Sequence, residues 1–155
     1  MIELPKLAIS IRQPWAWAIF HLGKDVENRS WRHRFRGPVL IHAGKGLRQA
    51  DLEDCAEMID AHPELAARLK AAGGFDREAL LGMTGGIVGA VTITDCVSAS
   101  DSPWFAGPHA FTLANPHPLP FRACPGALGF FDPDREAAPE TRCGPIEQLS
   151  MFDLL

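Results

Sequence analysis

The sequence has little that would place it in a membrane or direct it out of the cell. It contains no uninterrupted run of about 18 apolar residues, the length at which a membrane-spanning helix is expected. Its first residues show no basic segment followed by an apolar stretch and a small-residue cleavage site, which a secretory signal peptide would need. We therefore expect a soluble, cytoplasmic protein with no membrane partner.

Cysteine and histidine are present, but not in the spacings that bind metals. No Cys-x-x-Cys pair occurs, and the six histidines show no metal-ligand spacing beside the cysteines. The four cysteines are Cys55, Cys96, Cys124 and Cys143. We expect them to be reduced structural thiols, and we expect neither a metal site nor a cofactor. Any enzymatic activity is then expected to be metal-independent.

Net charge is low, but the charges are unevenly distributed. The chain carries a formal charge of -4, and with 155 residues, 46% of them hydrophobic, it is long enough to bury a core. Residues 1–48 hold nine basic and three acidic residues, a balance of +6, whereas the remainder holds six against sixteen, a balance of -10. Exposed charges act over roughly 8 to 10 Å, so the basic first third of the sequence predicts a positively charged surface that attracts a polyanion.

One short segment combines two basic residues, one acid and an indole: Lys24, Glu27, Arg29 and Trp31. If it is extended, Val26 turns inward and Glu27, Arg29 and Trp31 share the opposite face. Such a group is suited to bind a phosphate or a nucleobase. Arg can form two hydrogen bonds to an anion, Glu can accept a hydrogen bond from an amine or transfer a proton, and Trp can stack on a base. The alternative is a solvated edge strand with an ion pair worth about 0 to 1 kcal/mol.

This segment and its surroundings resemble the ASCH domain family. Its signature, Gly-x-Lys-x-x-Glu-x-Arg, is matched by Gly23, Lys24, Glu27 and Arg29. The resembling blocks follow one another in order at residues 7–16, 23–31, 36–43 and 86–96, and residues 126–131 are similar to the closing strand of the family. The resemblance implies an α+β fold over residues 1–132: a small, mixed, PUA-like β-barrel with a helix after the first strand and a helical insertion at about 47–81. It also implies a cleft lined by the Lys, Glu and Arg.

Periodicity places the neighbouring elements. Residues 7–11 alternate as a half-buried strand, and a helix is expected from Pro14 to Gly23. Its apolar positions, Trp15, Ala18, Ile19 and Leu22, are predicted to face the barrel. Trp17 falls on the opposite face of this helix, where it is either a second surface for stacking on a base or a buried residue. In the insertion, the carboxylates Asp51, Glu53, Asp54, Glu57 and Asp60 lie largely off the apolar stripe and predict a solvated face.

In residues 29–36 basic residues interleave with Trp31 and Phe35, a pattern that suits phosphate contacts with stacking on bases. The alternative is an ordinary basic turn between strands. We expect Gln13 or Glu27 to read a base edge. The candidate ligand-binding residues are Gln13, Trp15, Trp17, Lys24, Glu27, Arg29, Trp31, Arg32, Arg34 and Arg36.

The end of the chain differs in composition from the rest. Residues 133–145 have almost no large apolar side chain and predict a flexible linker. In the tail, residues 146–155, the run Gln148, Leu149, Ser150, Met151 and Phe152 resembles the peptide by which bacterial replication and repair proteins bind the DNA polymerase sliding clamp. We therefore expect a bacterial protein with a clamp-binding tail. The alternative is that these apolar residues dock back on the domain.

Two functions follow from these observations. The first is a module that binds nucleic acid, either RNA or single-stranded or modified DNA, and that the tail recruits to replication or repair machinery. The second is a small hydrolase that uses the same cleft, either a ribonuclease or an amidohydrolase acting on a modified nucleoside, as ASCH-like relatives deacetylate N4-acetylcytidine. Lys24 and Glu27 are its catalytic candidates, although those amidohydrolases carry Thr where this chain has Glu27. A regulatory sensor of a nucleotide-like ligand would use this cleft too.

Overall fold

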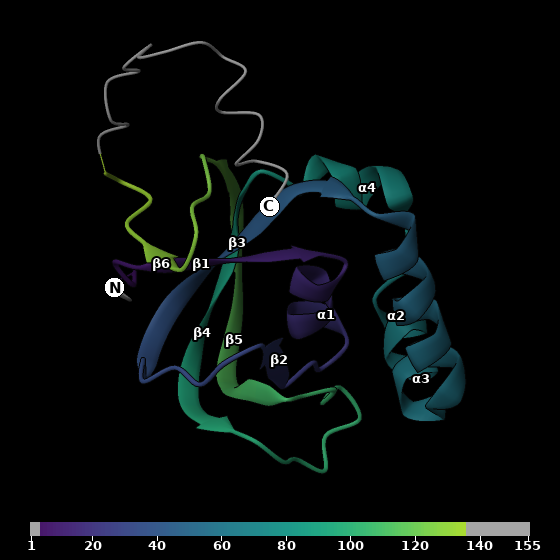
Figure 1. Ribbon diagram of the computed structural model, residues 1–155. Helices are drawn as coiled ribbons and strands as arrows, with labels where there is room; N and C mark the ends of the chain where they lie inside the picture. The colour runs from purple at the N-terminus through teal and green to yellow at the C-terminus, as the bar shows by residue number, and fades with distance from the viewer. Residues whose placement is uncertain (1–3, 136–155) are drawn as a thin grey trace, which may run out of the picture.

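A mixed six-stranded sheet forms the framework of the protein (Figure 1). The computed structural model describes residues 4–135. The strands are β1 (Ala8–Gln13), β2 (Val26–Arg29), β3 (Gly37–Leu47), β4 (Gly86–Val97), β5 (His109–Ala123) and β6 (Phe130–Phe131). They are ordered β2-β5-β4-β3-β1-β6, with β1 parallel to β3 and the other neighbours antiparallel. The expected mixed α+β class is confirmed.

The sheet is open, so the predicted closed barrel is wrong. Strands β2 and β6 lie at opposite ends of the strand order, and within residues 4–135 they do not pair with each other. Closure would need hydrogen bonds between these two edge strands. With four and two residues respectively, they offer few backbone groups for such pairing. Short edge strands also limit unwanted pairing with other chains.

Four helices complete the described chain: α1 (Trp15–His21), α2 (Gln49–Ala61), α3 (Pro63–Ala71) and α4 (Arg77–Gly82). The last three occupy the region for which helices are expected, and Figure 1 shows them on one side of the molecule, with α1 between the sheet and helices α2 and α3. Pro63 opens α3, and Asp76 caps α4 by accepting hydrogen bonds from the backbone N–H groups of Glu78 and Ala79. None of the helices within residues 4–135 is long and apolar enough to cross a membrane.

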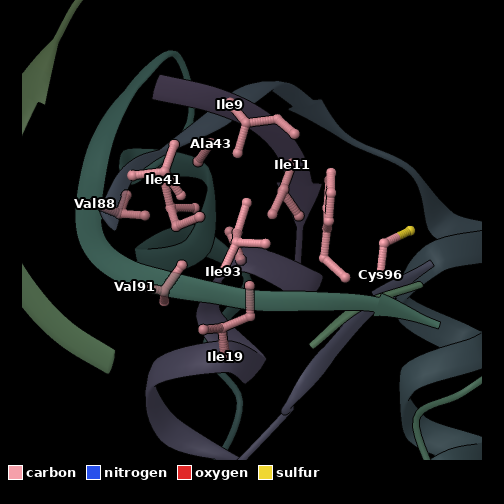
Figure 2. Close-up of a cluster of buried hydrophobic side chains, with 12 residues drawn as sticks. Ile9, Ile11, Ile19, Ile41, Ala43, Val88, Val91, Ile93 and Cys96 are labelled. Carbon is pink, nitrogen blue, oxygen red and sulfur yellow. The ribbon is translucent and has the colours of Figure 1, made fainter. Parts of the chain in front are cut away.

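Two apolar clusters hold α1 in place. In the first, side chains from β1, β3 and β4 pack with α1, and Figure 2 shows Ile93 between Ile9 of β1 and Ile19 of α1. The second joins α1 to the helical insertion and to the segment before β5. Its buried members are Ala18, Leu22, Val26, Cys55, Ile59, Leu65, Trp104 and Ala110. Because α1 is packed on both sides, the residues at its two ends are held between the sheet and α2.

Candidate functional site

A cleft of about 400 Å³ opens where β1, α1 and β2 meet helix α2 and the segment before β5. Its lining residues are Arg12, Trp15, Lys24, Glu27, Asn28, Asp51, Asp54, Met58, Trp104 and Ala106. Three of the ten, Trp15, Lys24 and Glu27, are among the ligand-binding residues predicted from the sequence. The insertion thus supplies one wall of the cleft through Asp51, Asp54 and Met58.

Lys24 and Glu27 form a tight ion pair at the base of β2. The Lys24 Nζ donates to Glu27 Oε2 and to the carbonyl of Val26, both at 2.6 Å. The side chains are only 4% and 16% exposed, so the pair is shielded from water. Gly23, with φ +67°, makes the turn that brings Lys24 from the end of α1 to this position. An ammonium has three donors, which leaves one for a ligand, and within residues 4–135 only one Glu27 oxygen has a hydrogen-bond partner.

Two indoles form apolar walls of the cleft. The rings of Trp15 and Trp104 lie edge to face, with centroids 6.4 Å apart and planes at 83°. Asn28 fixes the loop that carries Trp104, because its Nδ2 donates to the Trp104 carbonyl at 3.0 Å. Its Oδ1 accepts from the backbone N–H groups of Ala106 at 2.9 Å and Gly107 at 3.2 Å. Sequence reasoning missed both Asn28 and Trp104, since their meeting depends on the pairing of β2 with β5.

Asp51 corrects a prediction made from the helical pattern. It was expected on a solvated face with the other carboxylates of α2, yet it is only 7% exposed. Its carboxylate accepts from Arg12 Nε at 3.1 Å and from Trp15 Nε1 at 3.2 Å. These partners offset its burial, and they tie α2 to β1 and α1 across the cleft. Helical periodicity shows which residues share a face, but it cannot show that Arg12 from a distant strand covers that face.

Cys55 lies beneath the cleft, between α2 and α1. Burial raises the pKa of its thiol to about 12, against the opposing effect of the Lys24 charge. The thiolate is the nucleophilic form of cysteine, and at neutral pH it is almost absent here. Cys55 therefore contributes packing to the site, as expected of a structural thiol.

The basic segment of residues 29–36 is largely held against the protein. The Arg29 guanidinium lies 5.8 Å above the ring of Phe111, and Arg29 is not among the residues that line the cleft. Arg32 donates to Ser98 Oγ at 3.2 Å and to the Cys96 carbonyl at 3.3 Å. The contacts of Arg29 and Arg32 therefore hold the segment against the protein. The solvent-accessible parts of their guanidinium groups stay available to phosphates.

Arg36, Arg34 and Trp31 differ in how many contacts their side chains make with the rest of the protein. Arg36 pairs with Asp95 at 3.2 Å and donates to two backbone carbonyls of its own turn. Arg34 is exposed, and no hydrogen bond or ion pair to another residue of the described chain engages it. Trp31 is 64% exposed, with its ring 5.6 Å from that of His33. Trp31 and Arg34 thus present a stacking surface and a free cation to solvent.

Gln13 and Trp17 do not line the cleft. Gln13 is 1% exposed; its Nε2 donates to the Met83 carbonyl at 3.2 Å and its Oε1 accepts from the Trp17 backbone N–H at 2.8 Å. Its amide is thereby used to anchor the start of α1 and is not free to read a base. The Trp17 ring packs on His21 and Phe75, at 5.0 and 5.3 Å, and lines a separate hollow.

Two further expectations concern metals and the tail. Among residues 4–135 no group of three or more His, Cys, Asp or Glu side chains is arranged to hold a metal ion. The expected clamp-binding residues, Gln148 to Phe152, lie outside the described residues. Their role stays a prediction.

The structure is thus an α+β domain in which an open mixed sheet carries an inserted helical layer and a cleft holds a shielded Lys–Glu pair. The sequence model of the ASCH domain matches residues 9–114, more than half of the chain. The protein therefore belongs to the ASCH domain family. A search of curated proteins found no match. The match ends within β5 and includes the whole insertion.

Proposed function

We propose that this protein binds single-stranded nucleic acid, with RNA as the first candidate, by taking one base into the cleft. The observation that carries the proposal is the Lys24–Glu27 pair in a cleft walled by Trp15 and Trp104. The pair offers a donor and an acceptor to the edge of a base, and the indoles offer surface to its rings. Membership of the ASCH family supports nucleic-acid interaction in general terms.

Charge favours a base over a phosphate inside the cleft. Two of its three carboxylates are paired, Glu27 with Lys24 and Asp51 with Arg12. The third, Asp54, is exposed at the cleft and has no ion-pair partner among the described residues. A phosphate placed here would meet this unpaired negative charge, whereas an exocyclic amine would be attracted to it. Phosphates fit better on the basic segment outside.

The cleft and the basic segment are close enough to share one strand of nucleic acid. Glu27 lies in β2, and Trp31 follows it by four residues. An extended chain spans at most about 3.6 Å per residue, so their Cα atoms are within roughly 14 Å of each other. A base bound at Glu27 therefore leaves its neighbours within reach of Trp31 for stacking, and Arg34, three residues further along the chain, offers its exposed cation to phosphates.

The test is binding of labelled single-stranded RNA, single-stranded DNA and duplex DNA at several salt concentrations. We expect Trp31→Ala to weaken single-strand binding, and Arg34→Ala to lower the slope of log affinity against log salt by about one, the value for one lost phosphate contact. Lys70→Ala, an exposed charge on α3, is the matched control and should leave both unchanged. Equal behaviour of all three variants and the wild type would refute the proposal.

A second candidate function is hydrolysis of a modified nucleoside or of RNA. It is favoured by one observation, the 2.6 Å contact between Lys24 and Glu27 in a shielded cleft, because Glu27 could activate water there while Lys24 holds the developing negative charge. The test is a chromatographic screen of acylated nucleosides and RNA oligomers. Lys24→Met and Glu27→Gln should each abolish turnover. Turnover retained by both variants would exclude this mechanism.

Recruitment to a sliding clamp is the part of the proposal that rests on the sequence alone. Leu149, Met151 and Phe152 would supply the apolar anchors, and Gln148 an amide for the rim of the pocket. A chain truncated after Gly144 should lose binding to a purified bacterial clamp and keep its affinity for nucleic acid. Loss of both activities would assign the tail a structural role.

A further inference from the structure

A second and larger hollow, about 660 Å³, shares no lining residue with the cleft. It is bordered by the loop after β5 and by residues of β1, β3 and the start of β4. Its chemically active lining residues are Ser10, His42, Lys45 and Cys124. Nothing in the proposed binding of nucleic acid uses them.

Ser10 and His42 are paired inside this hollow. They are directly opposite each other in the parallel pairing of β1 with β3, and Ser10 Oγ lies 2.9 Å from His42 Nδ1. His42 is only 2% exposed. Its second ring nitrogen, Nε2, lies 2.9 Å from the backbone carbonyl of Cys124. A partly buried serine and a buried imidazole are therefore held together by the sheet on one side and by the loop after β5 on the other.

The Cys124 carbonyl determines which ring nitrogen of His42 carries the proton. A carbonyl oxygen only accepts, so His42 Nε2 must carry the hydrogen in the bond to Cys124. In the neutral ring Nδ1 is then the bare nitrogen, and the Ser10 hydroxyl donates to it. This is the arrangement by which a histidine activates a serine: nucleophile, base, and a third group that fixes the orientation of the base.

The loop after β5 also limits the space around the pair. A Cβ added to Gly126 would lie 2.7 Å from His42 Cε1, closer than packed atoms allow, and 3.0 Å from Ser10 Oγ, tighter than most packed contacts. The loop backbone can lie over the pair only because residue 126 has no side chain. Lys45 lines the same hollow and brings a cation to it. A cation in the hollow would favour the negative charge that develops on a carbonyl oxygen under attack.

We propose that this hollow is a second site, in which Ser10 is an acyl-accepting nucleophile for small carboxylic esters. The Ser10 Oγ bonds to the acyl carbon while its proton passes to His42 Nδ1, and the alcohol leaves with that proton. Water then attacks the acyl group on Ser10 and gives a proton to His42. Release of the carboxylic acid returns this proton to Ser10 Oγ, so no co-reactant besides water is required.

The protein contains a matched control for the test. Ser98 Oγ lies 2.9 Å from His109 Nδ1, the same distance as in the Ser10–His42 pair. Ser98 is exposed, and its oxygen also accepts from Arg32. No hydrogen bond from another residue of the described chain fixes the second nitrogen of His109. A serine that reacts only because a histidine is near would react equally at both positions.

The experiment is labelling of the full-length protein with a fluorophosphonate, whose fluoride is displaced by an activated serine, followed by peptide mass spectrometry. We expect modification of Ser10 and none of Ser98. Ser10→Ala should abolish labelling, and His42→Gln should slow it by ~100-fold or more, the usual contribution of a general base. The wild type should also hydrolyse p-nitrophenyl acetate faster than Ser10→Ala does.

Three results would overturn the proposal: no label on Ser10, equal labelling of Ser10 and Ser98, or an unchanged rate in His42→Gln. If His42→Gln does not fold, Gly126→Val offers a second measurement. It should block labelling by filling the space over the pair, and a labelled Gly126→Val protein would also refute the site. Lys70→Ala, the exposed control on α3, should label like the wild type, and labelling requires no nucleic acid, so this test can fail or succeed independently of nucleic-acid binding.

Discussion

Removing the Lys24–Glu27 ion pair should reveal how much this pair contributes to the free energy of unfolding. We consider Lys24→Met, which keeps most of the length of the side chain but removes its charge, and Glu27→Gln, which keeps the shape but removes the opposite charge. Each single variant leaves one charged group without its counter-charge, in a place where it is 4% or 16% exposed. The double variant removes both charges.

The expected cost follows from the geometry. At 2.6 Å, two unit charges attract each other by roughly 6 kcal/mol at an effective dielectric constant near 20, before the cost of removing them from water is subtracted. Removing one partner of a buried pair lowers the free energy of unfolding by about 3 to 5 kcal/mol, because the remaining charge stays buried and uncompensated. The double variant should cost less than the sum of the two single variants, with a coupling of roughly 1 to 3 kcal/mol.

Urea unfolding followed by tryptophan fluorescence measures these differences. We expect the midpoint to fall by roughly 1 to 3 M in each single variant. The exposed Arg36–Asp95 pair, with side chains 38% and 61% exposed, is the control, and its variants Arg36→Met and Asp95→Asn should each change the free energy of unfolding by only about 0 to 1 kcal/mol. Equal, small effects at both pairs, without coupling, would show that the cleft pair behaves as a surface pair and would refute this reasoning.

Three further predictions concern other parts of the structure. Asn28→Ala should lower the free energy of unfolding by roughly 1 to 3 kcal/mol and increase acrylamide quenching of tryptophan, because three hydrogen bonds to the loop of Trp104 are lost. Cys55, with a pKa of about 12, should resist iodoacetamide at pH 8 while the partly exposed Cys124 reacts, as peptide mass spectrometry would show. Burial, and secondarily the Arg29 charge, lowers the pKa of His33 in the folded protein below 6.5. As the pH drops through 6.5, the unfolded chain therefore binds a proton before the folded protein does, and the free energy of unfolding should fall. The fall in urea midpoint from pH 7 to pH 5 should be smaller in His33→Phe.

Local patterns in the sequence sufficed for much of the fold. Alternation at residues 7–11 predicted a strand, and β1 is observed at Ala8–Gln13. The expectation that Val26 faces inward is confirmed, since it is 2% exposed. The helical insertion expected at about 47–81 is observed as α2, α3 and α4, and Pro63 and Asp76 stand at the starts of α3 and α4. These features depend on neighbours within a few residues, and such interactions are encoded locally.

The composition of the cleft was decided by the tertiary structure. The Lys24–Glu27 segment was visible in the sequence because its residues are adjacent, but Arg12, Asp51 and Trp104 reach it from three different elements. Whether a carboxylate on a helix faces water or a distant arginine depends on how the helix docks, and no local period contains that information. The same holds for closure of the sheet, which depends on whether two edge strands meet, and for the Ser10–His42 pair, which exists because β1 lies parallel to β3 in one particular register.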